Sequence, residues 1–161
     1  MLRAVPNGWF SYDFTLFDRT GRPVARVDLA NWREKAKLEV SGTPYEAHHK
    51  AWASEFVLEK DGQVLAVAEK PSTWKDRFFF EHGGNRYELK KESAWGRNFE
   101  LTRDGVGSVG SVRPKGAFRR EWTVDMPGEL PLEVRVFLVW LAVLLWRRAD
   151  STAASGAAGG G

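Results

Sequence analysis

The chain repeats one pattern of about 43 residues three times, and this repeat constrains the fold more than any other feature. Each copy begins with a tryptophan, continues with a Phe-x-Leu pair and then reaches a glycine. The matching residues are Trp9, Phe14, Leu16 and Gly21 in the first copy, Trp52, Phe56, Leu58 and Gly62 in the second, and Trp95, Phe99, Leu101 and Gly105 in the third. A valine follows in each copy, at Val27, Val67 and Val112. Such a period indicates one supersecondary unit used several times.

Within each copy, apolar and charged residues alternate, which is typical of strands with one buried face. Residues 35–40 show the pattern, with Lys35, Lys37 and Glu39 between Ala36, Leu38 and Val40. Glycine-containing turns such as Asp61-Gly62 and Asp104-Gly105 separate these segments. One copy therefore predicts two hairpins, and three copies predict about twelve antiparallel strands, with a short last strand in the third copy. A propeller blade has a similar size, but propellers need at least four blades.

The third copy runs into a segment that cannot be a strand of this kind. Residues 131–148 read PLEVRVFLVWLAVLLWRR, and 136–146 are all apolar. Pro131 and Glu133 suit the start of a helix, and Arg147 and Arg148 suit its end. A helix that is apolar on all sides is buried in a core or in a membrane. Because a bilayer span needs about 20 apolar residues, the shorter run favours a core helix.

A barrel of twelve strands has an interior wider than its own side chains fill. The apolar helix would fill that space, and closure would leave no exposed sheet edge. We therefore predict a mainly β protein: a closed antiparallel barrel of about twelve strands, built from three four-stranded repeats and wrapped around a hydrophobic C-terminal helix. Residues 1–148 form this single domain, and the small residues of 149–161 form a disordered tail.

Composition limits the classes of function that fit this fold. The chain has no cysteine, so disulfides and thiolate chemistry are excluded. Residues 1–10 contain no apolar run of signal-peptide length, and we expect a cytoplasmic monomer, with peripheral association with a membrane as an open alternative. The 24 basic and 21 acidic residues give a net charge of +3 without a strongly one-signed segment, so nucleic acid is not an expected partner. Eight tryptophans and ten phenylalanines supply a large aromatic core.

Motifs that could carry chemistry have structural explanations. Gly105-Val-Gly107-Ser-Val-Gly110 matches a nucleotide-binding string, but Pro114 follows where that motif needs a helix. We interpret these glycines as a hairpin turn with close packing or a bulge. His48 and His49 are neighbours on a predicted strand and point to opposite faces, while His82 lies in a turn. We therefore expect no catalytic residues, no metal and no cofactor, and a protein that is not an enzyme.

The three four-stranded units with Phe-x-Leu hairpins (56–62 and 99–105), followed by the apolar helix, resemble the tubby C-terminal-like superfamily. This group includes tubby domains, phospholipid scramblase-like proteins and LURP-one-related proteins, and the resemblance covers residues 9–148. It implies a twelve-stranded barrel around its C-terminal helix, with roles in phosphoinositide binding, membrane association and protein interaction. Scramblase-like members carry palmitoylated cysteines and a calcium-binding segment, and this chain has neither.

Two basic clusters are the candidate site for an anionic headgroup. Each contains an aromatic residue, Trp32 in the first and Phe118 in the second, and they occupy equivalent places in copies one and three. Their basic residues are Arg33, Lys35 and Lys37, and then Arg113, Lys115, Arg119 and Arg120. The fold is expected to bring both to one end of the barrel.

The leading functional hypothesis is a non-enzymatic cytoplasmic binding module for anionic phospholipid headgroups or a protein partner. One alternative is a scramblase-like protein whose C-terminal helix inserts into a bilayer. Another is a barrel that binds a small ligand or acts as an enzyme, which would need an interior cavity.

Overall fold

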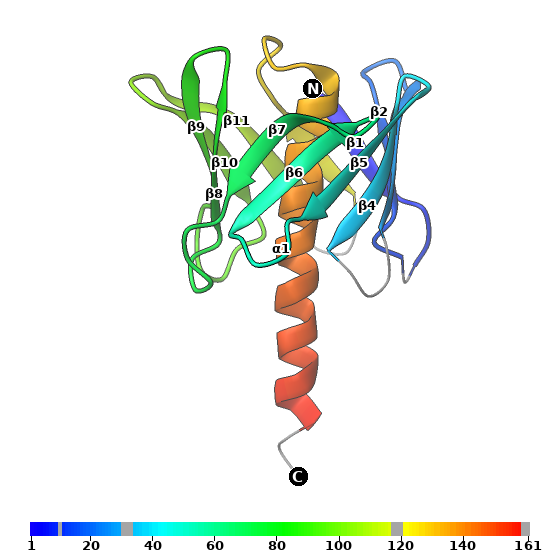
Figure 1. Ribbon diagram of the computed structural model, residues 1–161. Helices are drawn as coiled ribbons and strands as arrows, with labels where there is room; N and C mark the ends of the chain where they lie inside the picture. Colours follow the sequence, from blue (N-terminus) through cyan, green and yellow to red (C-terminus); the bar gives the residue numbers. More distant parts are fainter. Residues whose placement is uncertain (10, 30–33, 117–120, 159–161) are drawn as a thin grey trace.

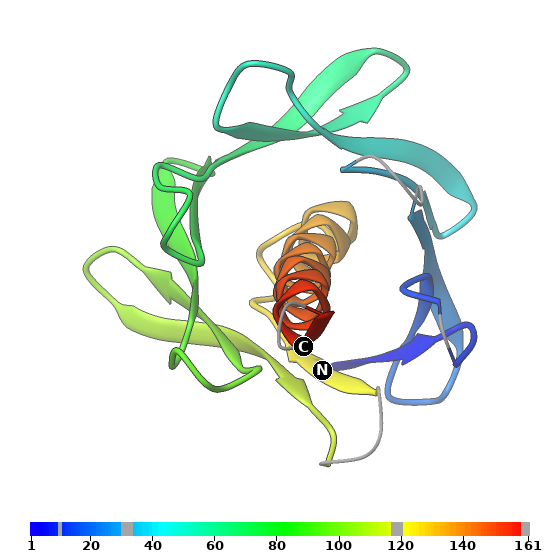
Figure 2. The ribbon, with the colours of Figure 1, turned by 90° about the horizontal axis from the view of Figure 1, so that it is seen from below.

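The computed structural model describes residues 1–9, 11–29, 34–116 and 121–158. It is a closed antiparallel barrel of twelve strands surrounding one helix, as predicted (Figures 1 and 2). The strands are β1 (Leu2–Pro6), β2 (Phe14–Phe17), β3 (Pro23–Leu29), β4 (Lys35–Val40), β5 (Thr43–His49), β6 (Glu55–Lys60), β7 (Gln63–Glu69), β8 (Arg77–His82), β9 (Asn85–Lys91), β10 (Phe99–Arg103), β11 (Gly107–Pro114) and β12 (Trp122–Asp125). The helix is α1 (Leu132–Ala158).

Neighbouring strands in the barrel are also neighbours in the sequence, except where the barrel closes. The first repeat contributes β2 to β5, the second contributes β6 to β9, and the third contributes β10 to β12. The fourth strand of the third repeat is β1, from the opposite end of the chain, which pairs with both β12 and β2. The predicted short strand after β12 is thus wrong, because the chain leaves β12 to start the helix.

Each repeat contains one β-bulge, and the three bulges occupy the same place. The register between the first two strands of a repeat shifts directly after Leu16, Leu58 and Leu101. The shift leaves one extra residue on the second strand, which is Val24, Leu65 or Val109. Bulges bend a strand and increase its twist, which closes the sheet into a barrel. The Phe-x-Leu pair thus marks the strand that faces each bulge.

The length of the first hairpin turn changes one feature of the predicted repeat. Val27 and Val112 pair with Phe14 and Phe99 and are fully buried, whereas Phe56 pairs with Ala68. Val67, which the repeat pattern matches with those two valines, lies one position earlier and faces outward. The two-residue turn at Asp61-Gly62 is shorter than the turn between β2 and β3, so the spacing differs by one residue.

The helix fills the barrel. Every residue from Val136 to Trp146 is at most 7% exposed. Trp140 is fully buried and lies 6.1 Å from Phe56, measured between ring centroids. Near the helix exit, Trp146 lies 4.7 Å from the Trp122 ring and donates a hydrogen bond of 3.0 Å from Nε1 to the Arg97 carbonyl. The interior thus contains packed side chains from both sheet and helix, as the apolar run predicts.

The structure differs from the predicted tail. The helix continues past Arg148 to Ala158 and projects from the barrel, where the sequence predicts disorder from residue 149 (Figure 1). An already formed helix is cheaply extended by alanine-rich sequence. The hydroxyls of Ser151, Thr152 and Ser155 donate to carbonyls four residues earlier at 2.9–3.0 Å.

We expect Trp140→Asp to abolish cooperative folding, because an unpaired charge would be buried among apolar side chains at a cost of several kcal/mol against a total stability of about 5–15 kcal/mol. The same substitution at Trp95, which is 96% exposed, is the matched control and should leave folding intact. Thermal unfolding followed by circular dichroism measures both. A cooperatively folded Trp140→Asp protein would contradict the packing of this helix.

We expect Gly110→Ala to destabilise the barrel by about 1–3 kcal/mol, the usual range for overpacking. A Cβ atom at Gly110 would lie 2.6 Å from the Asp125 carbonyl oxygen on β12. Gly128→Ala is the control, since its Cβ would meet no atom within 4 Å. Urea denaturation should separate the two variants, and equal stabilities would show that β11 and β12 are not this close.

Candidate functional site

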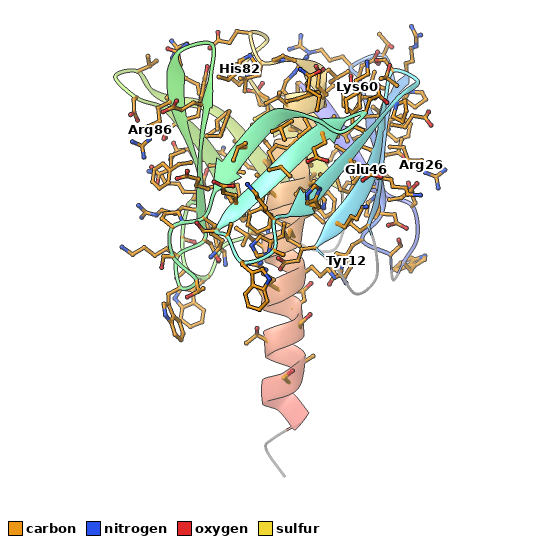
Figure 3. All side chains as sticks on the ribbon, viewed as in Figure 1. Tyr12, Arg26, Glu46, Lys60, His82 and Arg86 are labelled. Carbon is orange, nitrogen blue, oxygen red and sulfur yellow. The ribbon has the colours of Figure 1, made fainter. Side chains whose placement is uncertain are left out.

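The two ends of the barrel are built differently. The end where α1 leaves the barrel has loops of five to seven residues, at 7–13, 30–34, 50–54, 70–76, 92–98 and 115–121. The other end has mostly short turns, including 41–42, 61–62 and 83–84. We call them the helix-exit end and the turn end. Figure 3 places Tyr12 at the helix-exit end and Lys60 and His82 at the turn end.

Four tryptophans project from the loops of the helix-exit end into solvent. Trp9, Trp52, Trp74 and Trp95 are between 88% and 104% exposed. The expectation that the repeated aromatics build the core is wrong for these four, because they lie in loops outside the alternation of the strands. Trp32 and Phe118, at the matching places in the other loops, lie outside the described residues.

The repeat distributes these indoles around the barrel axis. Trp9, Trp52 and Trp95 each precede the first strand of a repeat, namely β2, β6 and β10. These strands are four places apart in a ring of twelve, so the indoles surround the helix at intervals of one third of the circumference. Exposed tryptophans at one end of a molecule are unusual, because a fully exposed indole leaves a large apolar surface in water.

Local hydrogen bonds fix the loops that present the indoles. Trp74 donates its backbone N–H to Ser72 Oγ at 3.2 Å, and Gly96 donates to Ser93 Oγ at 2.9 Å. Trp52 itself has a φ of 65°, in the left-handed region that bulky residues avoid. The Ala53 N–H bonds the Lys50 carbonyl at 3.2 Å across this turn. Strained residues of this kind persist where the surrounding structure holds them and cluster at functional sites.

Polar side chains connect the loops to the helix as it leaves the barrel. Arg148 forms a two-nitrogen contact with Glu34, and the Nε bond measures 2.7 Å. The other oxygen of Glu34 lies 2.8 Å from His49 Nδ1, and His49 Nε2 lies 2.7 Å from the Ala53 carbonyl. On another side, Asp150 accepts a hydrogen bond of 2.9 Å from the Tyr12 hydroxyl. The helix end and the tryptophan loops therefore form one connected surface.

A hollow of about 570 Å³ lies beside the helix exit, between α1 and the loop of Trp74. Lys70 lines it and is only 7% exposed, with its Nζ donating to the Ser72 and Thr73 carbonyls at 2.6 and 3.2 Å. Burial, and then the positive charge of Arg148, lower the pKa of Lys70 below 10.5. Lys70 thus stabilises the loop of Trp74 through these two hydrogen bonds.

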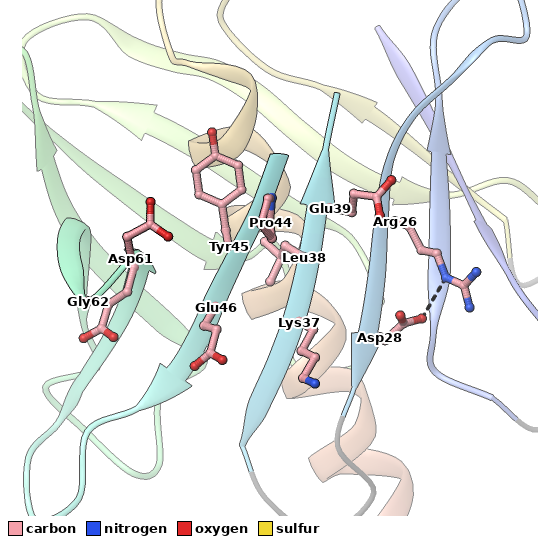
Figure 4. A pocket seen from close by; sticks show the side chains of 11 residues that line it. Arg26, Asp28, Lys37, Leu38, Glu39, Pro44, Tyr45, Glu46, Asp61 and Gly62 are labelled. Carbon is pink, nitrogen blue, oxygen red and sulfur yellow. Dashed lines mark hydrogen bonds and ion pairs between the residues drawn. The ribbon is translucent and has the colours of Figure 1, made fainter. Parts of the chain in front are cut away.

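The structure surrounds the first predicted basic cluster with carboxylates. Lys37 lines an open hollow of about 810 Å³ on the outer face of β3 to β6, and its neighbours across the strands are Asp28 and Glu46 (Figure 4). The lining contains five acidic and two basic side chains. Lys35 forms an ion pair of 3.0 Å with Glu46. Arg33 lies outside the described residues.

The second predicted cluster is only partly described. Arg113 donates to Glu92 at 2.7 Å, and this hydrogen bond is the main cause that lowers the pKa of Glu92. Lys115 is exposed at the helix-exit end. Arg119 and Arg120 lie outside the described residues. Among the described members, Lys35 and Lys37 lie on β4 and Arg113 lies on β11, five strands away in the ring, so these described residues do not form one patch.

The two ends also differ in charge. Among the described residues, the loops of the helix-exit end and the emerging helix up to Asp150 hold seven basic and six acidic side chains. The connections of the turn end hold two basic and four acidic side chains. Among the described residues, the connections and emerging helix at the helix-exit end thus have one excess positive charge, and the connections at the turn end have two excess negative charges.

The motifs examined for chemistry have structural roles. Gly105, in the turn before β11, and Gly107, the first residue of β11, have φ values of 75° and 98°, and Gly110 lies against β12. This agrees with their interpretation as a turn with close packing beside a bulge. His48 and His49 lie on β5, where His49 stacks on Phe56 at 4.4 Å. Within the described ranges, no group of three histidine or carboxylate side chains is placed to hold a metal ion.

Lys70 gives this end a pH dependence that can be measured. The pKa of Lys70 is lower in the folded protein than in the unfolded chain, so the unfolded chain binds the Lys70 proton more tightly. The contribution of Lys70 to the free energy of unfolding therefore rises with pH as the pH approaches 10.5. We expect the stability of the native protein, relative to Lys70→Met, to increase from neutral pH to about pH 10. Urea denaturation across this range measures the difference. A stability difference between the two proteins that falls as pH rises would contradict the burial of Lys70 beside Arg148.

Comparison with known proteins supports the fold. No protein-family model matches the chain, and no curated protein matches it. Among solved structures, the chain is similar to an X-ray structure of a protein from Arabidopsis thaliana, with a TM-score of 0.58 and 15% sequence identity. The match covers 92% of this chain and 90% of that one. The chain therefore shares its barrel fold with that plant protein.

In the part of the chain that the structure describes, no helix combines the length and apolarity needed to cross a membrane.

Proposed function

We propose that the protein is a non-enzymatic binding module that docks its helix-exit end on the surface of an anionic phospholipid membrane. The observation that carries this proposal is the set of four exposed indoles around the helix exit. Tryptophan is enriched at membrane–water interfaces, where its ring lies among the headgroups and its N–H stays hydrogen-bonded. A protein partner could also cover such a surface. Four indoles distributed around the helix exit suit the flat, deformable surface of a bilayer better than the fixed shape of a protein.

Charge supports the same orientation. Basic residues near an anionic bilayer contribute about 1 kcal/mol each, and the effect is screened by salt. Lys75 and Lys115 are exposed at the helix-exit end, and Arg119 and Arg120 belong to the same connection as Lys115. Lys35 and Lys37 support the proposal less, because carboxylates surround them. The resemblance to the tubby superfamily is consistent with membrane binding at the periphery.

The packing of α1 favours peripheral docking over the two alternatives. Insertion of the helix into a bilayer would empty a barrel whose interior it fills, and the part outside the barrel carries Ser151, Thr152 and other small or polar residues. A small-ligand carrier or an enzyme with an interior cavity would need the room that the helix occupies. The packing of α1 therefore favours a barrel that stays outside the bilayer, and the location that we propose is the cytoplasmic face of a membrane.

Co-sedimentation with vesicles tests the proposal. We expect the native protein to bind vesicles containing phosphatidylserine, to bind neutral vesicles weakly, and to lose affinity as salt rises. Trp52→Ala with Trp95→Ala should weaken binding about tenfold or more, because two of the inserted rings are lost. Val106→Ala is the matched control, since Val106 is an exposed apolar residue at the turn end.

Charge reversal separates the electrostatic part of the binding. Arg119→Glu with Arg120→Glu should weaken binding to the anionic vesicles by about tenfold or more at low salt, at about 1 kcal/mol per charge. The effect should shrink at high salt. No binding of the native protein to any vesicle, or binding that the tryptophan variants leave unchanged, would refute the proposal.

A further inference from the structure

The barrel wall has one open seam, between β7 and β8. β7 has seven residues and β8 has six, yet only two residue pairs join them, Ala68 with Phe80 and Glu69 with Phe79. Residues 63–67 of β7 therefore have no strand partner on the β8 side, and all of them except the bulge residue Leu65 pair with β6. Figure 2 shows the β6–β7 hairpin turning away from its neighbour on this side.

The other two repeats pair more extensively along the equivalent seam. The equivalent seam joins five residue pairs between β3 and β4, and four between β11 and β12. In the third copy, Gly110 occupies the place of Ala66 and approaches β12 so closely that a Cβ would lie 2.6 Å from a carbonyl oxygen. The seam between β7 and β8 thus has the fewest residue pairs of the three, although residues 107–110 of β11 also lack partners on β12.

The side chains along this seam are also more exposed and more apolar in the second copy than in the other two. The bulge residues Val24 and Val109 are partly buried against the core, whereas their counterpart Leu65 is 39% exposed. The outward residue next along the strand is Arg26 in the first copy and Ser111 in the third, but it is Val67 in the second, 36% exposed. The second copy therefore has apolar residues where a solvated wall has polar ones.

The open seam forms a groove of about 560 Å³. Val64, Leu65 and Val67 line it from β7, and Phe79 lines it from β8. The Arg86 guanidinium lies over the Phe79 ring at 5.0 Å, and Glu69 and Glu81 supply two carboxylates. Natural proteins protect an unpaired strand with lysine or proline, and the sequence of β7, QVLAVAE, contains neither.

We propose that this groove binds an extended peptide segment of a partner protein, which pairs as an added strand with residues 63–67 of β7. Backbone hydrogen bonds would supply affinity, and aliphatic side chains at alternate positions would contact Val67 and Leu65. A basic side chain on the peptide would complement Glu69 and Glu81. A single extended segment suits this site because the free stretch of β7 is only five residues long and the groove of about 560 Å³ is bordered by Phe79 and Glu81 of β8.

The groove and the helix-exit end can act together. The unpaired part of β7 begins at Gln63, directly after the turn at 61–62, so the groove opens toward the turn end. Docking of the helix-exit end on a membrane would leave it accessible. The peptide proposal does not depend on membrane binding, and its test uses no lipid.

Selection of peptides from a phage-displayed heptapeptide library tests the proposal with the full chain as target. The strongest selected peptide is then synthesised and titrated against the native protein and two variants. Val67→Lys should weaken binding about tenfold or more, since it removes an apolar contact and places a charge in the groove. Val106→Lys is the matched control, because it makes the same change at an exposed valine outside the groove, and it should bind as the native protein does.

Amide NMR identifies the binding mode. In the free protein, the amides of 63–67 that face β8 should exchange with solvent faster than the equivalent amides of β3, and the peptide should slow their exchange. Methylation of alternate peptide nitrogens should abolish binding, because it removes the donors of the added strand. Failure to select a peptide, binding that survives Val67→Lys, seam amides as protected as those of β3, or a dimer of this chain that occupies the groove would each overturn the proposal.

Discussion

The packing of an apolar helix inside a twelve-stranded barrel is the interaction on which the rest of the structure depends. A ring of this many strands encloses more space than its inward side chains fill, and a helix that is apolar on every side cannot remain in water. The helix fills the interior of the barrel, and the barrel shields the apolar helix from water. The buried contacts of Trp140 and Trp146 with the strands show how completely the two surfaces are matched.

This packing also determines where function can lie. The helix enters from the turn end after β12 and leaves at the other end, so its final turns emerge among the long loops. Arg148 and Asp150 then connect those loops to the helix. The interior is occupied, and binding must therefore use the outer surface. The exposed indoles at the helix exit and the open seam between β7 and β8 are the two places where that surface departs most from a solvated wall.

The architecture could be predicted from the sequence because its causes are local. Alternation, glycine turns and one all-apolar run indicate strands, hairpins and a core helix without any knowledge of long-range pairing. The closing strand β1 could not be found in this way, since Leu2–Pro6 precedes the first recognisable copy of the repeat. The helical extension beyond Arg148 was missed because a tail of small residues is compatible with both disorder and continued helix.

The site was harder to predict, because it depends on neighbours across strands. Lys35 and Lys37 lie on the expected outer face, but the register places Glu46 and Asp28 beside them, and no single strand reveals this. The repeated tryptophans were assigned to the core, as aromatic residues usually are. Their place after a strand has ended, among Gly, Ser and Pro, was the available signal for exposure.

Fluorescence quenching by lipids brominated at defined depths tests the central functional claim most directly. The account predicts that anionic vesicles carrying bromine near the headgroups quench part of the tryptophan emission, and that this part decreases when Trp52 and Trp95 are replaced. Emission from the buried Trp140 should be unaffected. Vesicle binding without quenching, or quenching that is equal in the protein lacking those two indoles, would contradict docking through the helix-exit end.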